Sequence, residues 1–245
     1  DIPGICADAS DPEKLVMAGI SNPYCKAVVA LTDDNAINLH IAITAKVMNP
    51  DTNVICRADS SNIEDNMLSF GTDHIINPYR TFARQLVLAA KSPSQYALNE
   101  WFRSALDEPL PSKVKIAKGR WIICGYGRFG RAIYEELLSH GLTAQIIEPD
   151  TSTLDLPENT IIGDGTGVST LTEANVSEAI GIIAGSNDDS NNLSIIVTAR
   201  LLNPDLFVII RQNKQSNADL FRQSKADIVM ESGNVIAKNI RTLRT

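Results

Sequence analysis

The sequence predicts an α/β fold in which a doubly wound parallel sheet occurs as two tandem copies, the first of them truncated at its N-terminus. Three observations support this prediction. Short β-branched runs alternate with helical stretches of about ten residues, which is typical of parallel strands covered on both faces. Parts of the chain resemble one another at a constant offset of 154 residues. A glycine-rich turn joins a strand to a helix in the second half of the chain.

Composition is that of an ordinary globular protein, and it excludes several classes of function. The chain has 245 residues, a formal net charge of −7 and 44% hydrophobic residues. The excess of acidic residues argues against a bulk basic face that would hold nucleic acid. The longest apolar runs are far below the roughly 18 residues that a membrane span requires. No basic and apolar leader of the secretory type opens the chain.

The internal repeat organises the chain. Residues 34–51 and 188–205 share many identities without a gap, and both end in Asn-Pro-Asp. In the same register Arg57 corresponds to Arg211. A period this long indicates duplicated domains rather than a solenoid of short repeats.

The second copy shows the complete alternation of strands and helices. We expect strands at 121–124, 145–148, 160–162, 180–184, 207–211 and 228–230, and helices at 131–140, 169–176, 191–202 and 216–223. Gly141 is placed to end the first of these helices. Asn203-Pro204 is placed to end the third, because proline cannot continue a helix.

The first copy lacks its beginning. It starts where the third strand should lie, and it has no glycine loop, first helix or first two strands. Because the first strand is central in such a sheet, we expect the chain to be cut from a longer protein or to be completed by another segment. Because the first residue is Asp1 rather than Met, we favour the first interpretation, that the chain is cut from a longer protein. We divide the chain into an incomplete domain (1–90), a linker helix with a linker (91–118) and a complete domain (119–245).

The motif Gly125-x-Gly127-x-x-Gly130 follows a strand and opens a helix. Gly125 permits a tight turn, Gly127 lets backbone amides approach a pyrophosphate, and Gly130 allows the helix to pack closely on the strand. The N-terminus of the helix adds partial positive charge. Arg128 offers a cation to phosphate, with a solvated loop arginine as the alternative. The pattern predicts a dinucleotide site.

Polar residues follow three neighbouring strands at the same crevice. Glu148 lies 23 residues after Gly125, where a carboxylate accepts from ribose hydroxyls and repels a 2′-phosphate, which favours NAD(H) or another adenine nucleotide over NADP. Asp164 fits an adenine-side contact or a plain Asp-Gly turn. Asp188, after Ser186-Asn187, either faces the crevice or caps the next helix.

The crevice lacks a recognisable set of catalytic groups. We see no Ser/His/Asp set, no Cys/His pair and no second domain of another pattern that would bind a substrate. A repeated dinucleotide fold of this kind indicates a sensor rather than an enzyme. An NAD-dependent oxidoreductase fragment is the alternative.

These motifs resemble those of the potassium-transport nucleotide-binding family, also called RCK or TrkA-N-like domains. The resemblance covers 116–245 completely and 1–90 as a truncated copy. It rests on Cys124–Gly130, Glu148, Gly163–Thr166, Ser186–Asp188, Asn203-Pro204 and Arg211.

The resemblance implies a Rossmann-type domain in a non-catalytic regulatory assembly. Such domains form homo-oligomers on the cytoplasmic face of the membrane, and ligand binding shifts the domain arrangement that controls the pore of a potassium channel or a Trk-type transporter. The implied ligands are NAD(H), ADP or ATP, with Ca²⁺ in some channel members. Helices near 78–90 and 234–243 correspond to crossover helices that build subunit contacts. The implied binding residues are Gly125, Tyr126, Gly127, Arg128, Phe129 and Gly130 at the phosphate loop, Glu148 at the ribose, Asp164, Gly165 and Thr166 on the adenosine side, and Ser186 and Asn187 in the same crevice.

Overall fold

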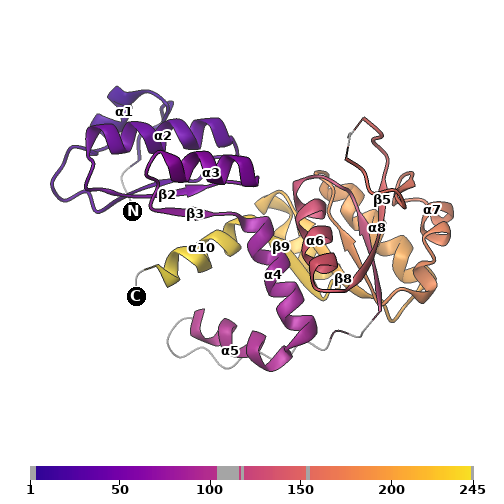
Figure 1. The fold of residues 1–245 in the computed structure, drawn as a ribbon. Coiled ribbons are helices and arrows are strands. Elements are labelled where there is room, and N and C mark those ends of the chain that lie inside the picture. Colours follow the sequence, from indigo (N-terminus) through magenta and orange to yellow (C-terminus); the bar gives the residue numbers. More distant parts are fainter. Residues whose placement is uncertain (1–3, 104–115, 117–118, 153–154, 244–245) are drawn as a thin grey trace. The chain divides into compact units, whose positions relative to one another are not determined.

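The structure is a computed structural model that describes residues 4–103, 116, 119–152 and 155–243. The chain divides into two compact units, residues 1–78 and 79–245 (Figure 1). The sequence places the end of the first copy at residue 90 instead. In the described part of the chain, no helix has both the length and the apolar character that a membrane crossing requires.

The first unit contains a three-stranded parallel sheet in the order β1-β2-β3. Its strands are β1 (Ala27–Ala30), β2 (Asn53–Arg57) and β3 (His74–Ile76), and its helices are α1 (Pro12–Met17), α2 (Asn35–Met48) and α3 (Ser61–Ser69). Helices α2 and α3 lie on the same face of the sheet (Figure 1). Ile41 and Ala45 of α2 and Met67 of α3 are buried there against Val54 and Cys56 of β2.

The third strand expected at the start of the first copy is not formed, since residues 4–6 have no strand structure. The physical reason lies in the order of the complete sheet of the second unit. There the third strand, β6 (Ile161–Ile162), pairs only with the second strand, β5 (Thr143–Glu148). Among the described residues of the first unit, the sheet has no counterpart of β5 with which residues 4–6 could pair.

The second unit contains a six-stranded parallel sheet in the order β6-β5-β4-β7-β8-β9. This is the doubly wound order 3-2-1-4-5-6, and it confirms the predicted Rossmann-type fold. The other strands are β4 (Arg120–Cys124), β7 (Gly181–Ala184), β8 (Phe207–Gln212) and β9 (Ile228–Glu231). The helices are α4 (Pro78–Lys91), α5 (Pro93–Arg103), α6 (Arg128–Ser139), α7 (Val168–Glu173), α8 (Asp189–Leu202), α9 (Ala218–Gln223) and α10 (Ser232–Thr242), with short 3₁₀ turns η1 (Val176–Glu178) and η2 (Gln215–Asn217).

Alternate residues of the strands enter two cores, one on each face of this sheet. Trp121 and Ile123 of β4 lie in a core that also contains residues of α4 and α6. Ile122 and Cys124 of the same strand lie in the other core, with residues of α7, α8 and α9. Burial on both faces explains why the strands are continuous apolar runs rather than alternating ones.

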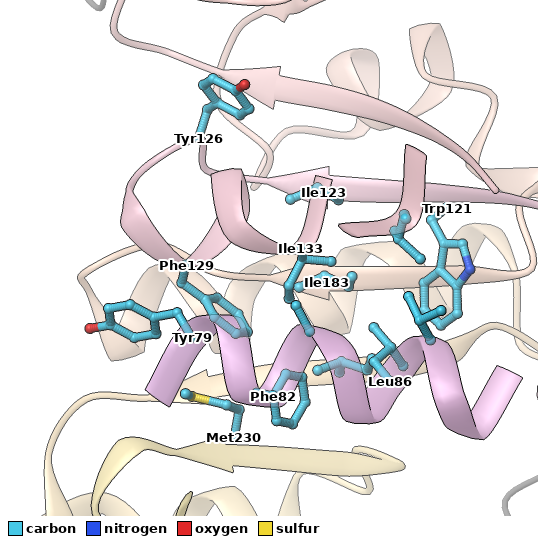
Figure 2. Close-up of a cluster of buried hydrophobic side chains, with 14 of the residues drawn as sticks. Tyr79, Phe82, Leu86, Trp121, Ile123, Tyr126, Phe129, Ile133, Ile183 and Met230 are labelled. Carbon is cyan, nitrogen blue, oxygen red and sulfur yellow. The ribbon is translucent and has the colours of Figure 1, made fainter. Parts of the chain in front are cut away.

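Helix α4 explains where the boundary between the units falls. Its residues Tyr79, Phe82 and Leu86 are buried in the same core as Trp121 and Phe129 (Figure 2). The spacing of three and four residues places these side chains on one face of the helix. The sequence shows that α4 has an apolar face, but not which sheet that face covers.

Helix ends follow the expected chemistry, but several bounds differ from those predicted. The helix predicted over 169–176 ends at Glu173 as α7, and the one predicted over 216–223 is divided between η2 and α9. Gly141 adopts a φ of +72° after α6, and the Leu142 N–H donates to the carbonyl of Leu137 at 2.9 Å, as a helix-ending glycine allows. Helix α6 begins at Arg128 rather than at Arg131, with Gly127 as its N-cap. Of the predicted linker 91–118, residues 104–115, 117 and 118 lie outside the described residues.

Candidate functional site

A cavity of about 270 Å³ lies at the carboxyl ends of β4, β5 and β7. Strand β4 pairs with β5 on one side and with β7 on the other, so the cavity opens where the strand order reverses. Open α/β sheets bind ligands at this switch point. The lining residues are Cys124, Gly125, Tyr126, Gly127, Ile147, Glu148, Pro149, Asp150, Asp164, Gly165, Gly185, Ser186, Asn187, Asn191 and Ile195.

The glycine loop forms the wall of the cavity between β4 and α6. Gly125 has a φ of +99°, a conformation that favours glycine, and its N–H donates to the carbonyl of Ile147 at 2.9 Å. Gly127 has open space around the position of a Cβ, so the backbone is bare on that side. A Cβ on Gly130 would overlap the carbonyl oxygen of Gly125. Gly125 and Gly130 therefore have the structural functions that the motif predicts, whereas the contact of Gly127 with a pyrophosphate stays a prediction.

Glu148 joins the end of β5 to the glycine loop. One carboxylate oxygen accepts from the Tyr126 N–H, and the other accepts from the Asp150 N–H at 3.0 Å. A carboxylate oxygen has more than one lone pair, so hydroxyl groups can donate to it as well. The site thus presents a negatively charged acceptor beside the loop, which suits ribose hydroxyls and repels a 2′-phosphate.

The turn after β6 brings Asp164 and Gly165 to the cavity. A carboxylate oxygen of Asp164 accepts from the Thr166 N–H at 2.9 Å, which closes the turn. A Cβ on Gly165 would lie 2.9 Å from the Cys124 Sγ, so this close approach requires glycine. Thr166 does not line the cavity, and its carbonyl accepts from the Thr198 hydroxyl at 3.1 Å.

A buried asparagine shapes the turn after β7. Asn192 is fully buried, and its side-chain oxygen accepts from the Ser186 N–H at 2.9 Å. Its side-chain NH₂ donates to the carbonyl of Ser186 at 3.0 Å and to that of Arg211 at 2.9 Å. These three bonds hold Ser186 and the adjacent Asn187 at the rim of the cavity. Asp188 caps α8, accepting from the Asn191 N–H at 2.9 Å, which confirms the capping alternative.

Three residues predicted for the phosphate loop do not line the cavity. Arg128 and Gly130 belong to the first turn of α6, and Gly130 contacts the loop from behind. Phe129 is fully buried, with its ring 5.8 Å from that of Tyr79 and 5.7 Å from that of Phe82. The Phe129 side chain packs in the core, and it would have to leave the core to contact a ligand in the cavity.

The cavity also contains residues that the motifs did not indicate. Asp150 lies two residues after Glu148, and Asn191 lies in the first turn of α8. Gly185 directly follows β7, where the sequence places the end of the fourth strand at the crevice, and a Cβ there would lie 2.9 Å from the Phe129 ring. Since the fourth strand ends at the switch point, the helix turn that follows it was an available signal for Asn191.

The first unit retains the same polar frame. The Asn38 side chain accepts from the Thr32 N–H at 2.9 Å and donates to the carbonyls of Thr32 at 2.9 Å and of Arg57 at 3.1 Å. These bonds repeat those of Asn192 at an offset of 154 residues. The repeat in the sequence is therefore also a repeat in structure. Where the second copy has Asn187, the first copy has Asp33.

Calcium finds no support in the geometry. Across residues 4–103, 116, 119–152 and 155–243, no three His, Cys, Asp or Glu side chains gather into a group that could hold a metal ion.

Burial and the nearby Asp164 raise the pKa of Cys124 far above its usual range. The Cys124 side chain therefore lines the cavity as a neutral thiol.

Comparison with known proteins finds relatives that are described as potassium transport proteins. Potassium channel protein 1 of Methanocaldococcus jannaschii is 31% identical over 121 residues, which are 47% of this chain and 36% of that protein. A Trk system potassium uptake protein TrkA homolog of Methanothermobacter thermautotrophicus is 29% identical over 130 residues, 51% of this chain and 59% of the relative. The chain thus spans less than two thirds of the length of these relatives.

Solved structures and a family model agree with the fold. The GsuK channel bound to NAD matches 97% of this chain and 54% of its own with a TM-score of 0.75 at 16% identity. The GsuK structure bound to ADP matches with a TM-score of 0.71 at 20% identity, over 97% of this chain and 56% of its own. The family model described as the TrkA-N domain matches residues 1–78 and 121–232, which correspond to the two copies. Since these residues are most of the sequence, the chain belongs to the TrkA-N domain family.

Proposed function

We propose that this chain is a nucleotide-binding regulatory part of a potassium channel or of a Trk-type potassium transporter. NAD(H), ADP or ATP binds in the cavity at the glycine loop, and its binding shifts the domain arrangement that controls a pore. The pore belongs to a membrane domain or a membrane subunit, and this chain acts at the cytoplasmic face of that membrane. Nucleic acid is not a partner.

The observation that carries this proposal is the pairing of the glycine loop with Glu148 at the switch point. The bare backbone at Gly127 and the N-terminus of α6 suit a pyrophosphate. The Glu148 carboxylate, 3.0 Å from the Asp150 N–H, suits the ribose. Asp164 and Gly165 then lie on the adenosine side, and Ser186 and Asn187 face the phosphates from β7.

The relatives support the regulatory part of the proposal. Two of them are described as a potassium channel protein and a Trk potassium uptake protein. The GsuK channel, which shares the fold over nearly the whole chain, has been solved with NAD and with ADP. For a ligand to control a pore, it must bind two arrangements of the protein with different affinity.

We further propose that copies of the chain assemble into a homo-oligomer. Helix α8 exposes Val197 and Leu201 on consecutive turns, with exposed fractions of 63% and 78%, and α2 exposes Val47 to 76%. Val47 and Leu201 are equivalent positions of the two copies. Sedimentation velocity tests this proposal, since Leu201→Glu should shift the chain towards smaller species, whereas Leu68→Glu, at an exposed apolar residue of α3, should not.

Calorimetry with ADP, NADH and NADPH tests the binding part of the proposal. We expect ADP and NADH to bind and NADPH to bind more weakly, because Glu148 repels the 2′-phosphate. Failure of both ADP and NADH to bind would refute it. Incubation with NADH and common carbonyl compounds tests the oxidoreductase alternative, since a regulatory domain should leave the NADH absorbance unchanged.

A further inference from the structure

Arg211, at the end of β8, lies between the cavity and helix α4. Its side chain donates to the side-chain oxygen of Asn187, a residue of the cavity, at 2.9 Å. It also donates to the hydroxyl of Tyr79, in the first turn of α4, at 3.0 Å. The guanidinium carbon lies 5.1 Å from the centre of the Tyr79 ring and 6.0 Å from that of Phe129. Only 9% of Arg211 is exposed.

We propose that Arg211 is a positioning residue that orients Asn187 towards a bound nucleotide, and that Tyr79 of α4 holds Arg211 in this position. Occupancy of the cavity and the packing of the first turn of α4 are then coupled through one buried side chain. This inference rests on the proposed function, because it assigns the regulation of the same site.

The first step concerns the amide of Asn187. An arginine side chain has donors and no acceptor. The side-chain oxygen of Asn187 therefore accepts the hydrogen bond from Arg211, and the Asn187 NH₂ group takes no part in this bond. Since Asn187 lines the cavity, this NH₂ group is the donor available to phosphate or ribose oxygens. Without Arg211, the amide could turn and present its oxygen, which would repel phosphate.

The second step concerns Tyr79. This residue is 1% exposed, and its ring lies 5.8 Å from that of Phe129, two residues after Gly127 of the glycine loop (Figure 2). Tyr79 therefore contacts Arg211, which bonds to the cavity residue Asn187, and Phe129, whose buried ring lies against the cavity residue Gly185. Stacking on aromatic faces and hydrogen bonding to the hydroxyl compensate the buried guanidinium for its lost hydration.

The first copy of the repeat lacks this arrangement. At the position of Arg211 it has Arg57, which forms an ion pair with Asp33 in place of the bond to Asn187. A carboxylate has no donor for phosphate, so Asp33 cannot do what Asn187 does. The residue that corresponds to Tyr79 is Gly233, which has no ring or hydroxyl. Among the described residues, the hydrogen bond of this arginine to a tyrosine of a helix is therefore a feature of the second copy.

The position of Tyr79 in the chain gives the coupling its consequence. Only Asn77 and Pro78 separate Tyr79 from the last residue of β3 in the first unit. A ligand that strengthens the hydrogen bond between Arg211 and Asn187 also fixes the bond between Arg211 and Tyr79. Tyr79 lies at the point where the chain passes from the first unit to the second. By linkage, the factor by which a bound nucleotide favours the packed first turn of α4 is also the factor by which displacement of that turn weakens nucleotide binding.

The test uses the full chain and ADP, with two measurements on each variant. Calorimetry gives the dissociation constant, and hydrogen exchange with mass spectrometry gives the effect of ADP on peptides from residues 77–91. Tyr79→Phe removes only the hydroxyl and keeps the packed ring. Arg211→Lys keeps the charge but removes the guanidinium group, whose two nitrogens donate to Asn187 and to Tyr79. Arg57→Lys is the matched control in the first copy. Asn187→Asp converts the site to the Asp33 arrangement.

We expect Tyr79→Phe and Arg211→Lys to weaken ADP binding by about tenfold, the effect of losing a hydrogen bond to a charged group. Asn187→Asp should weaken it further, and Arg57→Lys should leave it unchanged. ADP should slow exchange in residues 77–91 of the wild type but not of Tyr79→Phe. If the wild type binds ADP, and exchange in 77–91 and the affinities of Tyr79→Phe and Arg211→Lys stay unchanged, the coupling is wrong while the proposed function stands. If the wild type binds neither ADP nor NADH, both are wrong.

Discussion

Replacing Gly130 by alanine should destabilise the second unit although alanine is the better helix former. The new Cβ would overlap the carbonyl oxygen of Gly125 and lie 3.0 Å from its carbonyl carbon. Both atoms belong to the backbone, so no side chain can rotate away. Overpacking of this kind costs up to about 3 kcal/mol, and the gain in helix propensity is about 1 kcal/mol. We expect a net loss of about 2 kcal/mol, which corresponds to about 4–8 °C in Tm.

Gly127→Ala is the matched control in the same motif. A Cβ at Gly127 meets nothing within 4 Å, and its φ of −68° suits any residue. Alanine is a poorer N-cap than glycine, so we expect a loss of stability below about 1 kcal/mol. Since the bare backbone at Gly127 faces the cavity, the methyl group should still weaken ADP binding. The two glycines therefore separate the structural from the binding role of the loop.

Urea unfolding followed by tryptophan fluorescence measures both effects on stability. The two tryptophans, Trp101 and Trp121, both lie in residues 79–245, so the signal reports the second unit. Calorimetry with ADP then measures binding to each folded variant. An unfolding midpoint of Gly130→Ala equal to that of the wild type would refute the overlap argument. Wild-type affinity of Gly127→Ala for ADP would show that phosphate does not lie against this backbone.

Three further predictions follow from single side chains. Glu148→Ala should weaken NADH binding by about 1–3 kcal/mol in calorimetry, the range for hydrogen bonds to a charged group, and unchanged affinity would remove Glu148 from the site. Burial raises the pKa of Asp189, but hydrogen bonds from Asn217 and the loop before it lower that pKa more, so the net pKa is below the usual range. Its stabilising effect is full above the unfolded-state pKa of about 4 and is lost as the pH falls through the lower folded-state pKa. Asp189→Asn should therefore flatten the loss of urea stability as the pH falls below about 4, and an unaltered loss of stability in acid would contradict this. Cys6 is exposed and should react with iodoacetamide at pH 8, whereas Cys124 is buried with a raised pKa and should stay unmodified until the protein unfolds.

Much of the site was predictable because its residues follow strand ends, which a parallel sheet brings together. The glycine loop, Glu148 and Asp164 are of this kind, and the structure places them around one cavity. Phe129 was assigned to the ligand because it lies inside the glycine motif. Its burial depends on α4, which begins 51 residues earlier, and no pattern within the motif records that contact.

The contacts of Arg211 were not predictable for the same reason. Arg211 lies 24 residues from Asn187 and 132 from Tyr79, and each pair meets only when β7, β8 and α4 have packed. The repeat showed that an arginine recurs at this position but not what it touches. Sequence periodicity gives the face that a helix buries, and the tertiary fold decides which partner covers that face.

The two copies together distinguish what holds the fold from what the second site requires. Both keep the buried asparagine that ties the turn after one strand to the end of the next, as Asn38 and as Asn192. Such a frame orders the backbone whether or not a ligand binds. The residue beside that turn differs, an acceptor-only Asp33 in one copy and Asn187 in the other. If a nucleotide binds as proposed, a carboxylate at that rim opposes a phosphate whereas an amide oriented by Arg211 donates to it, so duplication of the frame alone would not duplicate the binding site.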